Sequence, residues 1–172
     1  RPKERSIVHF DAAELLTENF ELLKNSDEVS AKHRLELDLE PASVSIAADP
    51  DQLSQIFWNL ARNALKAMPD GGELRVRGRL SGPTFLFSVS DTGCGMTERQ
   101  RANLFHPFQS FFDDGTGIGM AIVYRIVEEH GGRLSVHSRP GDGTEIVVEL
   151  PVLGSKGRPA EAPEAQTTGA QA

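Results

Sequence analysis

An asparagine-containing segment has residue types and a spacing that could bind a ligand. Asn59, Asn63 and Lys66 recur at intervals of four and three residues, so they share one stripe of a helix. Asparagine is a poor helix former, so two of them one turn apart indicate either a function or a tolerated, solvated polar face. Two amide oxygens and one ammonium group could together hold a magnesium ion and a phosphate.

A glycine-rich segment, DTGCGM at residues 91–96, places Asp91 at the end of an alternating strand and at the start of a tight turn. Gly93 and Gly95 permit a positive φ and the close approach of a flat ligand to the backbone. A carboxylate at this point could accept a hydrogen bond from an adenine amino group. An ordinary Asp-Gly turn stays open, as does the Asp-Thr-Gly of an aspartic protease, which needs a second such carboxylate.

A second glycine-rich segment, GTGIGM at residues 115–120, comes just before a predicted helix, where backbone N–H groups can bind an anion. No parallel strand directly precedes it, which argues against a dinucleotide-binding fold. Between the two glycine segments, residues 97–114 include Phe105, Phe108, Phe111 and Phe112. This pattern indicates a lid over a site, or a connection in which Phe105 and Phe108 pack on the core.

The elements that must position these residues alternate between helices and strands. Apolar spacing and capping residues predict helices at residues 11–24, 51–68, 98–105 and 118–130, the second of them started by Asp49 and Pro50. Alternation predicts strands at residues 34–40, 44–47, 73–80, 84–91, 134–138 and 145–150, with 44–47 as the partner of 34–40. The predicted fold class is α/β: a two-layer sandwich whose mixed, mostly antiparallel sheet has helices on one face.

Composition narrows the classes of function. The 172 residues are enough for one domain of ordinary size, and residues 154–172 have the composition of a disordered tail. A net charge of −7 argues against a nucleic-acid partner. A single cysteine excludes an internal disulfide framework and a multi-cysteine zinc site. No long apolar run or signal segment is present, so we expect no membrane contact by this chain and a cytoplasmic location.

Taken together and in this order, the motifs resemble the GHKL ATPase superfamily. They look most like the catalytic, ATP-binding domain of bacterial sensor histidine kinases, in the nitrogen-regulation branch. The matching residues are NLARNALKAM, DTGCGM, LFHPF, GTGIGMAIV and GDGT, and the resemblance covers residues 6–151. It implies the Bergerat α/β sandwich fold, with ATP or ADP and Mg²⁺ as ligands.

The resemblance also implies roles for individual residues. Asn63, with Asn59, would bind Mg²⁺, and Lys66 would reach a phosphate. Asp91 would bind the adenine amino group, and Thr144 would lie near the adenine. The rest of the implied ATP-binding set is Ala67, Gly93, Gly95, Met96, Phe105, Gly115, Thr116, Gly117, Ile118, Gly119 and Met120.

The sequence departs from the family pattern in the lid. No Lys or Arg lies between Arg101 and Gly115, so a basic lid contact to the γ-phosphate is missing. Arg62, Lys66 or Arg101 could substitute for it. Cys94 lies inside the first glycine segment, either as a small residue that lines the pocket or as a point of redox control.

The phosphoacceptor is also missing, because none of the 5 histidines stands in a His-Glu or His-Asp pair on a long helix. The implied division is therefore a linker stub at residues 1–5, an ATP-binding catalytic domain at 6–153 and the tail at 154–172. The acceptor histidine is expected on a dimerising helical hairpin outside this chain. No catalytic residue is assigned within the chain, which alone should bind ATP but turn it over poorly.

The function implied by the resemblance is that of a protein histidine kinase, which binds Mg-ATP and donates the γ-phosphate to that external histidine. The expected partners are the hairpin and, indirectly, a response regulator. Two alternatives stay open. One is a protein-serine kinase resembling the anti-sigma-factor switch proteins, and the other is a non-catalytic ATP-sensing module, which the missing basic lid residue favours.

Overall fold

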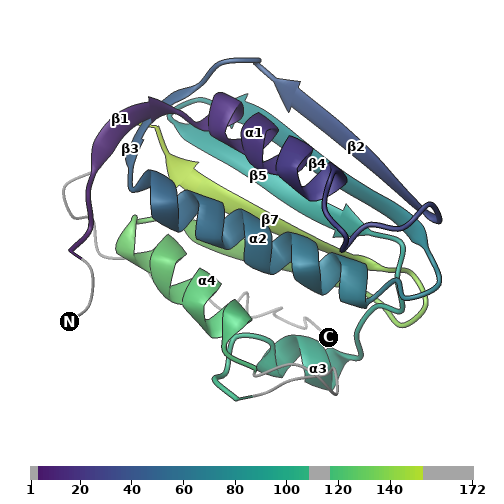
Figure 1. The fold of residues 1–172 in the computed structure, drawn as a ribbon. Coiled ribbons are helices and arrows are strands. Elements are labelled where there is room, and N and C mark those ends of the chain that lie inside the picture. Colours follow the sequence, from purple (N-terminus) through teal and green to yellow (C-terminus); the bar gives the residue numbers. More distant parts are fainter. Residues whose placement is uncertain (1–3, 109–116, 153–172) are drawn as a thin grey trace, which may run out of the picture.

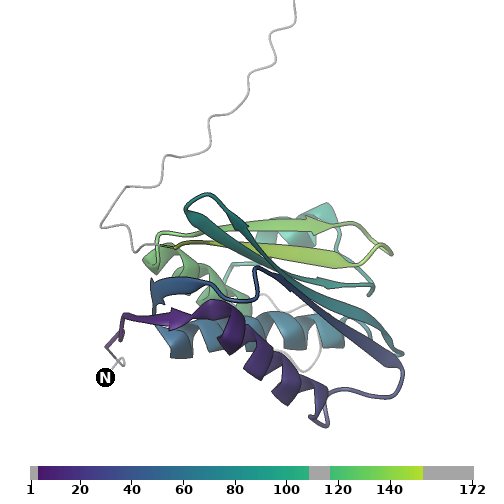
Figure 2. The same cartoon turned by 90° about the horizontal axis from the view of Figure 1, so that it is seen from above.

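The computed structural model describes residues 4–108 and 117–152. Helices cover one face of a sheet (Figure 1), and the view from above separates the two layers (Figure 2). The predicted two-layer α/β sandwich is confirmed. Its elements, in chain order, are β1 (Val8–Asp11), α1 (Ala12–Lys24), β2 (His33–Glu40), β3 (Ser45–Ala48), α2 (Pro50–Lys66), β4 (Gly72–Ser81), β5 (Thr84–Asp91), α3 (Glu98–Asn103), α4 (Gly119–Glu129), β6 (Arg133–Ser138) and β7 (Thr144–Pro151).

The main sheet has the strand order β2-β4-β5-β7-β6. β2 and β4 run parallel, whereas the other neighbouring pairs in this sheet are antiparallel. A parallel pair needs a long crossover connection, and the segment that contains α2 supplies it. The crossover lays α2 across the sheet, where it forms the middle of the helical layer (Figure 1).

The predicted pairing of residues 44–47 with residues 34–40 is wrong. β3 instead pairs antiparallel with β1 in a separate two-stranded sheet, and β1 was not predicted at all. In the main sheet, the leucines of β2 lie opposite Leu74, Val76 and Gly78 of β4. This register puts the apolar faces of both strands on the side that the helices cover, which favours the parallel pairing over a local hairpin.

The core lies between the sheet and the helices, and α2 contributes one whole face to it. Phe85 and Phe87 of β5 are almost completely buried in the same core. Each such side chain contributes about 1.5–3 kcal/mol of transfer free energy, so packing rather than helix propensity holds α2 in place. The buried residues of α2 are Leu53, Ile56, Phe57, Leu60, Ala61, Ala64 and Leu65.

α2 begins where the sequence predicts. The Asp49 carboxylate accepts hydrogen bonds from the backbone N–H groups of Asp51 and Gln52, at 3.0 and 3.3 Å, and Pro50 is the first helical residue. The helix ends at Lys66, two residues before the predicted end. Because the cap and the buried face fix the rotation of α2, the positions of its polar side chains are fixed as well.

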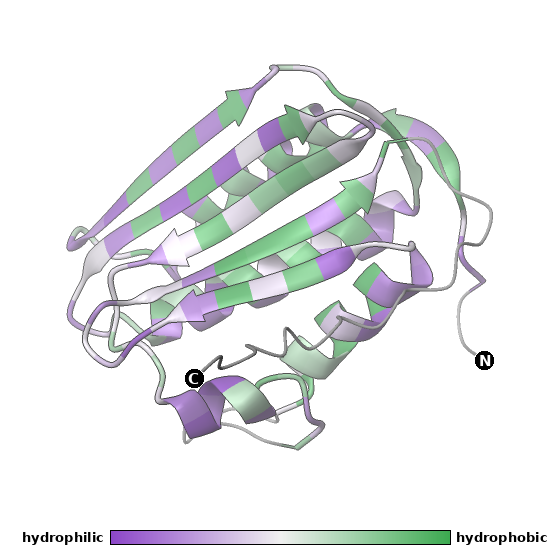
Figure 3. Ribbon diagram, turned by 180° about the vertical axis from the view of Figure 1, so that it is seen from behind, coloured by the Kyte–Doolittle hydropathy of each residue, from purple (hydrophilic) through white to green (hydrophobic). Residues whose placement is uncertain are grey.

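The face of the sheet opposite the helices is open, and polar and apolar residues alternate along β2 and β4 (Figure 3). Two ion pairs join these strands, Arg75 to Glu36 at 3.2 Å and Arg79 to Asp38 at 2.6 Å. Charged side chains at a sheet edge discourage pairing with other chains. Across the described residues, every helix is too short or too polar to cross a lipid bilayer.

Candidate functional site

A cavity of about 240 Å³ is lined by α2, the ends of β5 and β7, the loop after β5, α3 and the first residues of α4. Asn59, Asn63 and Lys66 all line it. The prediction that these three residues share one stripe is therefore confirmed, and the stripe borders a cavity, where Asn59 and Asn63 are half-buried and Lys66 is exposed. The neighbouring face of α2 is buried in the core, which holds the stripe at the cavity wall.

Asp91 lines the cavity at the end of β5, directly opposite Thr144 at the start of β7. Burial raises the pKa of Asp91, although hydrogen bonds from the backbone N–H groups of Gly93 and Thr144 act in the opposite direction. The Gly93 N–H donates to the carboxylate at 2.8 Å. A carboxylate has about four acceptor sites, so Asp91 keeps the capacity to accept a hydrogen bond from a ligand in the cavity.

The first glycine segment packs tightly on its neighbours. Gly95 has φ +67°, and a side chain there would collide with the backbone oxygen of Arg139. Gly93 has no positive φ, but a Cβ at this position would collide with the backbone oxygen of Ala67, to which the Cys94 N–H donates at 3.1 Å. Gly95 lines the cavity, whereas Gly93 instead lets the loop approach the end of α2.

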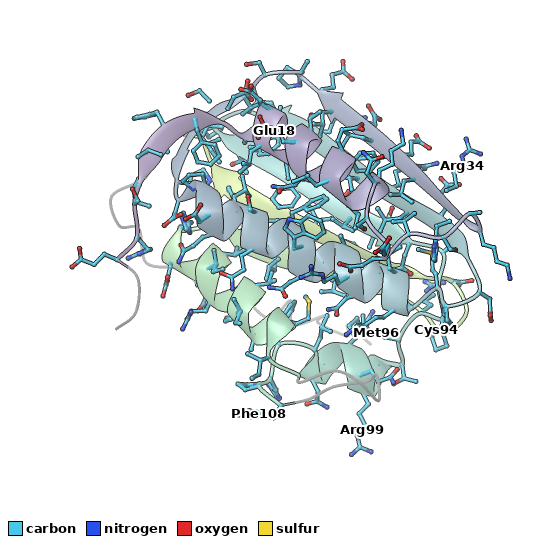
Figure 4. The ribbon with its side chains drawn as sticks, in the orientation of Figure 1. Glu18, Arg34, Cys94, Met96, Arg99 and Phe108 are labelled. Atoms are coloured by element: carbon cyan, nitrogen blue, oxygen red, sulfur yellow. The ribbon has the colours of Figure 1, made fainter. Side chains whose placement is uncertain are left out.

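A short hydrogen-bond network joins this loop to the turn between β6 and β7. The Ser138 hydroxyl accepts from the Met96 N–H at 2.8 Å and lies 2.8 Å from the Thr144 hydroxyl. The network holds Met96 and Thr144 at the same wall of the cavity. Met96 and Cys94 are seen near the C-terminal end of α2 in Figure 4, and Cys94 is an exposed thiol that also lines the cavity.

Another part of the wall is formed where α4 begins. Gly117, with φ +71°, Gly119 and Met120 line the cavity. A Cβ on Gly119 would lie 2.9 Å from Oδ1 of Asn59, so a glycine is what allows α4 to start this close to α2. Ile118 caps the helix without a side-chain hydrogen bond. The first N–H groups of a helix have no partner within the helix, so the start of α4 offers donors at the cavity.

Comparison with known proteins assigns this arrangement to a family. Residues 48–154 match the family described as histidine kinase-, DNA gyrase B-, and HSP90-like ATPase. The chain belongs to this ATPase family. Sensor histidine kinase ZraS of Klebsiella oxytoca is 38% identical over 157 residues, which make up 91% of this chain and 34% of ZraS. Sporulation kinase E of Bacillus subtilis is 40% identical over 120 residues, 69% of this chain and 16% of that protein.

Solved structures of the family have the same fold. The catalytic domain of histidine kinase ThkA superposes with a TM-score of 0.78 at 23% identity, over 87% of this chain and 97% of that domain. Full-length ShkA in complex with AMPPNP superposes with a TM-score of 0.76 at 31% identity, over 91% of this chain and 33% of ShkA. The chain is thus an ATP-binding catalytic domain of the histidine kinase type, and it spans about a third of the length of ZraS or ShkA.

Not every residue expected to bind ATP in this domain lines the cavity. Gly93, Phe105 and Ile118 do not. Gly115 and Thr116 lie outside the described residues. The expected residues that do line it are Asn59, Asn63, Lys66, Ala67, Asp91, Gly95, Met96, Gly117, Gly119, Met120 and Thr144.

The two described phenylalanines of the expected lid behave differently. Phe105 packs against the core, with its ring centre 5.5 Å from that of Tyr124 in α4. Phe108 is 77% exposed, so the expectation that it packs on the core is wrong. Its φ of +63° and the hydrogen bond from its N–H to the Gly117 oxygen, at 3.0 Å, turn the backbone away from the core. Residues 109–116 of the expected lid lie outside the described part of the chain.

Sequence reasoning missed several residues that line the cavity. The period of two in a strand places Val89 on the same face as Asp91, and Ile146 on the same face as Thr144, so alternation alone could have found these two. The missed residues are Leu60, Ala64, Val89, Gln100, Leu104 and Ile146. Most of them are apolar, as expected for walls that receive a flat ring.

Proposed function

We propose that this domain binds Mg-ATP in the cavity and donates the γ-phosphate to a histidine on a helical hairpin outside the given sequence. The observation that carries the proposal is the polarity of the cavity. A partly buried carboxylate lines the cavity together with apolar side chains, and the amides of Asn59 and Asn63, a lysine and the start of α4, which lies against Asn59, line it as well. This combination supports a purine base beside the carboxylate and phosphates beside the amides and the start of α4.

The adenine end is organised around Asp91. Its carboxylate would accept a hydrogen bond from the exocyclic amino group of adenine, while Val89, Met96 and Ile146 would contact the ring. A carboxylate in this place favours adenine over guanine, which presents a carbonyl oxygen where adenine presents its amino group. The hydroxyl of Thr144, which lies opposite Asp91 in the strand pair, is held by Ser138 and would supply a further polar contact.

The phosphate end combines charge with backbone donors. Lys66 would contact a phosphate as a point charge, and the N–H groups that open α4 would donate to phosphate oxygens. Asn59 and Asn63 would hold Mg²⁺ through their amide oxygens, which are hard ligands of the kind that this ion prefers. When bound, the ion would neutralise charge on the phosphates.

The chemistry would be an in-line transfer: an imidazole nitrogen of the acceptor forms a bond to the γ-phosphorus, and the bond to the β,γ-bridging oxygen breaks as ADP leaves. The part of this domain would be to position ATP and to neutralise its charge. His33 and His130 are poor candidates for the acceptor because both ring nitrogens of each are engaged. Their partners are Ser30 and Met68 for His33, and Asp49 and Ile126 for His130.

The likeness to full sensor kinases supports the rest of the proposal. The parent protein would contain the dimerising hairpin, a response regulator would receive the phosphate from it, and the domain would work in the cytoplasm, where ATP is available. These partners and this location are proposed by analogy with relatives such as ZraS, of which the chain spans about a third.

The test is phosphate transfer in trans. The purified chain is incubated with Mg²⁺, γ-labelled ATP and the separately purified hairpin of the parent protein, and the stability of the label to acid and base is measured. The proposal predicts an acid-labile, base-stable label on the hairpin. An acid-stable label on a serine would favour the anti-sigma-type kinase, and ATP binding without any transfer would favour a non-catalytic ATP-sensing module. Either result would contradict the proposal.

A further inference from the structure

Arg62 lines the cavity from the C-terminal half of α2. It follows Asn59 by three residues and precedes Lys66 by four, so it belongs to the same side of the helix. Among the described residues that line the cavity, Arg62 and Lys66 are the basic ones. Arg101, which the sequence also offered as a cation for the γ-phosphate, does not line it.

The guanidinium of Arg62 is held from two sides. Its Nε lies 3.1 Å from each carboxylate oxygen of Glu28, and its Cζ lies 5.0 Å from the centre of the Trp58 ring. Trp58 is itself fixed, because its Nε1–H donates to Oδ1 of the buried Asn19 in α1 at 3.2 Å. These contacts fix the guanidinium beside the cavity that Arg62 lines, before any ligand arrives.

The remaining donors of Arg62 have no partner among the residues that the structure describes. Within the described part of the chain, its two terminal nitrogens, Nη1 and Nη2, have no hydrogen-bond partner. Arg79, on the open face of the sheet, is different: its terminal nitrogens donate to the Asp38 backbone, the Asp38 carboxylate and the Gly78 oxygen. When an arginine is held through its Nε, the N–H groups of its two terminal nitrogens stay available. These groups can donate two parallel hydrogen bonds to two oxygens of one phosphate.

The lid sequence explains why a cation on α2 would be needed. No Lys or Arg occurs between Arg101 and Gly115, and this stretch contains the acidic residues Asp113 and Asp114. The charge of a terminal phosphate must therefore be met from elsewhere. Arg62 and Lys66 are the basic side chains that the described cavity offers, and they lie one helical turn apart.

We propose that Arg62 binds the γ-phosphate of ATP through its terminal nitrogens, with Glu28 and Trp58 holding the guanidinium, and that it makes the domain prefer ATP to ADP. The inference rests on the proposed function, since it assumes that the cavity binds ATP with its phosphates toward α2. It assigns Arg62 to the basic contact with the γ-phosphate that the sequence of the expected lid lacks. Because ADP has no γ-phosphate, removal of Arg62 should affect the two nucleotides unequally.

The experiment measures the dissociation constants of AMPPNP and of ADP for the full chain by titration calorimetry in the presence of Mg²⁺. The R62Q variant should weaken AMPPNP binding about tenfold or more, as expected for the loss of a charge-assisted hydrogen bond, while ADP binding should change about twofold or less. The matched control is R79Q, which removes an arginine of similar exposure, 45% against 53%, from an ion pair far from the cavity. R79Q should leave both constants unchanged.

Each other outcome decides against the inference. Equal weakening of both nucleotides by R62Q, or no weakening, would show that Arg62 only braces α2 against Glu28. If R62Q fails to fold by circular dichroism, R62K, which keeps the charge but not the fork, must still lower the preference for AMPPNP, and an unchanged preference would overturn the inference. If the wild-type chain binds neither nucleotide, the proposed function falls and this inference falls with it. Normal binding with an unchanged preference in R62Q would overturn this inference alone.

Discussion

At the scale of a single residue, Asp91 is a partly buried ionisable group in the wall of the cavity. Its carboxylate is partly buried, and burial raises its pKa, yet two backbone N–H groups hydrogen bond to it. Such a group costs stability when it ionises, so its presence at the end of β5 is better explained by binding than by folding. Its place opposite Thr144 at the start of β7 fixes the carboxylate at the wall of the cavity.

The substitution Asp91→Asn should weaken ATP binding about tenfold or more, because an unpaired polar group in a binding site loses its hydrogen bond and its hydration. The carboxylate accepts from the N–H groups of Gly93 and Thr144, so an amide NH₂ at this position would meet either a backbone donor or the adenine amino group. Titration calorimetry with Mg-ATP measures the loss. Wild-type affinity in the variant would remove Asp91 from the site.

The same residue predicts a pH dependence of stability. The folded-state pKa of Asp91 is raised above its ordinary value of 3.8, so between these two values the folded protein binds more protons than the unfolded chain. The free energy of unfolding contributed by Asp91 therefore falls as the pH rises through this interval, and the loss is complete above the raised pKa. The Asp91→Asn variant lacks this loss. Urea unfolding gives the free energy of unfolding of both proteins from acidic to neutral pH. As the pH rises, this free energy should increase in the variant relative to the wild type. If the two free energies change with pH in parallel, the expected pKa shift of Asp91 is contradicted.

At the scale of elements, the site depends on how closely α4 approaches α2. A Cβ on Gly119 would lie 2.9 Å from the side-chain oxygen of Asn59, so these two residues set the spacing of the helices where α4 begins. At the far end of α4, the His130 ring accepts the Asp49 N–H at 3.2 Å and links the end of α4 to the start of α2. The two helices are thus joined at one end and separated by a glycine at the other.

The substitution Gly119→Ala should separate stability from function. Alanine is the better helix former by about 0.5–1 kcal/mol, so the melting temperature should stay the same or rise. Its methyl group would displace the Asn59 amide, which we propose as a magnesium ligand, so nucleotide affinity should fall in the presence of Mg²⁺. Titrations with and without Mg²⁺ check this. An equal loss without Mg²⁺ would show that the displacement acts on the nucleotide rather than on the ion.

The elements also show what the sequence can and cannot predict. The start of α2 could be read from Asp49 and Pro50 because a helix cap is a local interaction. The partner of β2 could not, because a parallel pair forms between strands separated by a helix, and only the assembled core decides it. β1, with four residues, is too short for a pattern.

The candidate site likewise has features that the sequence predicts and features that it does not. The stripe of Asn59, Asn63 and Lys66 follows from helical spacing and was predictable. The exposure of Phe108 was not, because it depends on a backbone turn with a positive φ that its composition does not reveal. The paired ends of β5 and β7, which bring Asp91 beside Thr144, are long-range as well.

At the scale of the whole molecule, the net charge of −7 does not conflict with a polyphosphate ligand. Glu36 and Asp38 of β2 are paired with Arg75 and Arg79 of β4. The sheet face away from the helices is the one toward the viewer in Figure 3. The cavity lies on the helical side and is lined by Lys66, by the start of α4 and by Arg62, which is paired with Glu28. Fields in a partly buried cleft depend on nearby groups more than on total charge.

The measurement that tests the central claim most directly is a titration of the isotope-labelled chain with Mg-AMPPNP, followed by the amide chemical shifts of each residue. If the cavity is the ATP site, saturable shifts should appear in three separate segments, residues 59–67, 91–96 and 117–120, together with Thr144, all with one dissociation constant. The amides of β2, on the open sheet away from the cavity, should stay unchanged. Shifts confined to β2, or no saturable shift at Asp91 and Asn63, would contradict the claim that these segments form one nucleotide site.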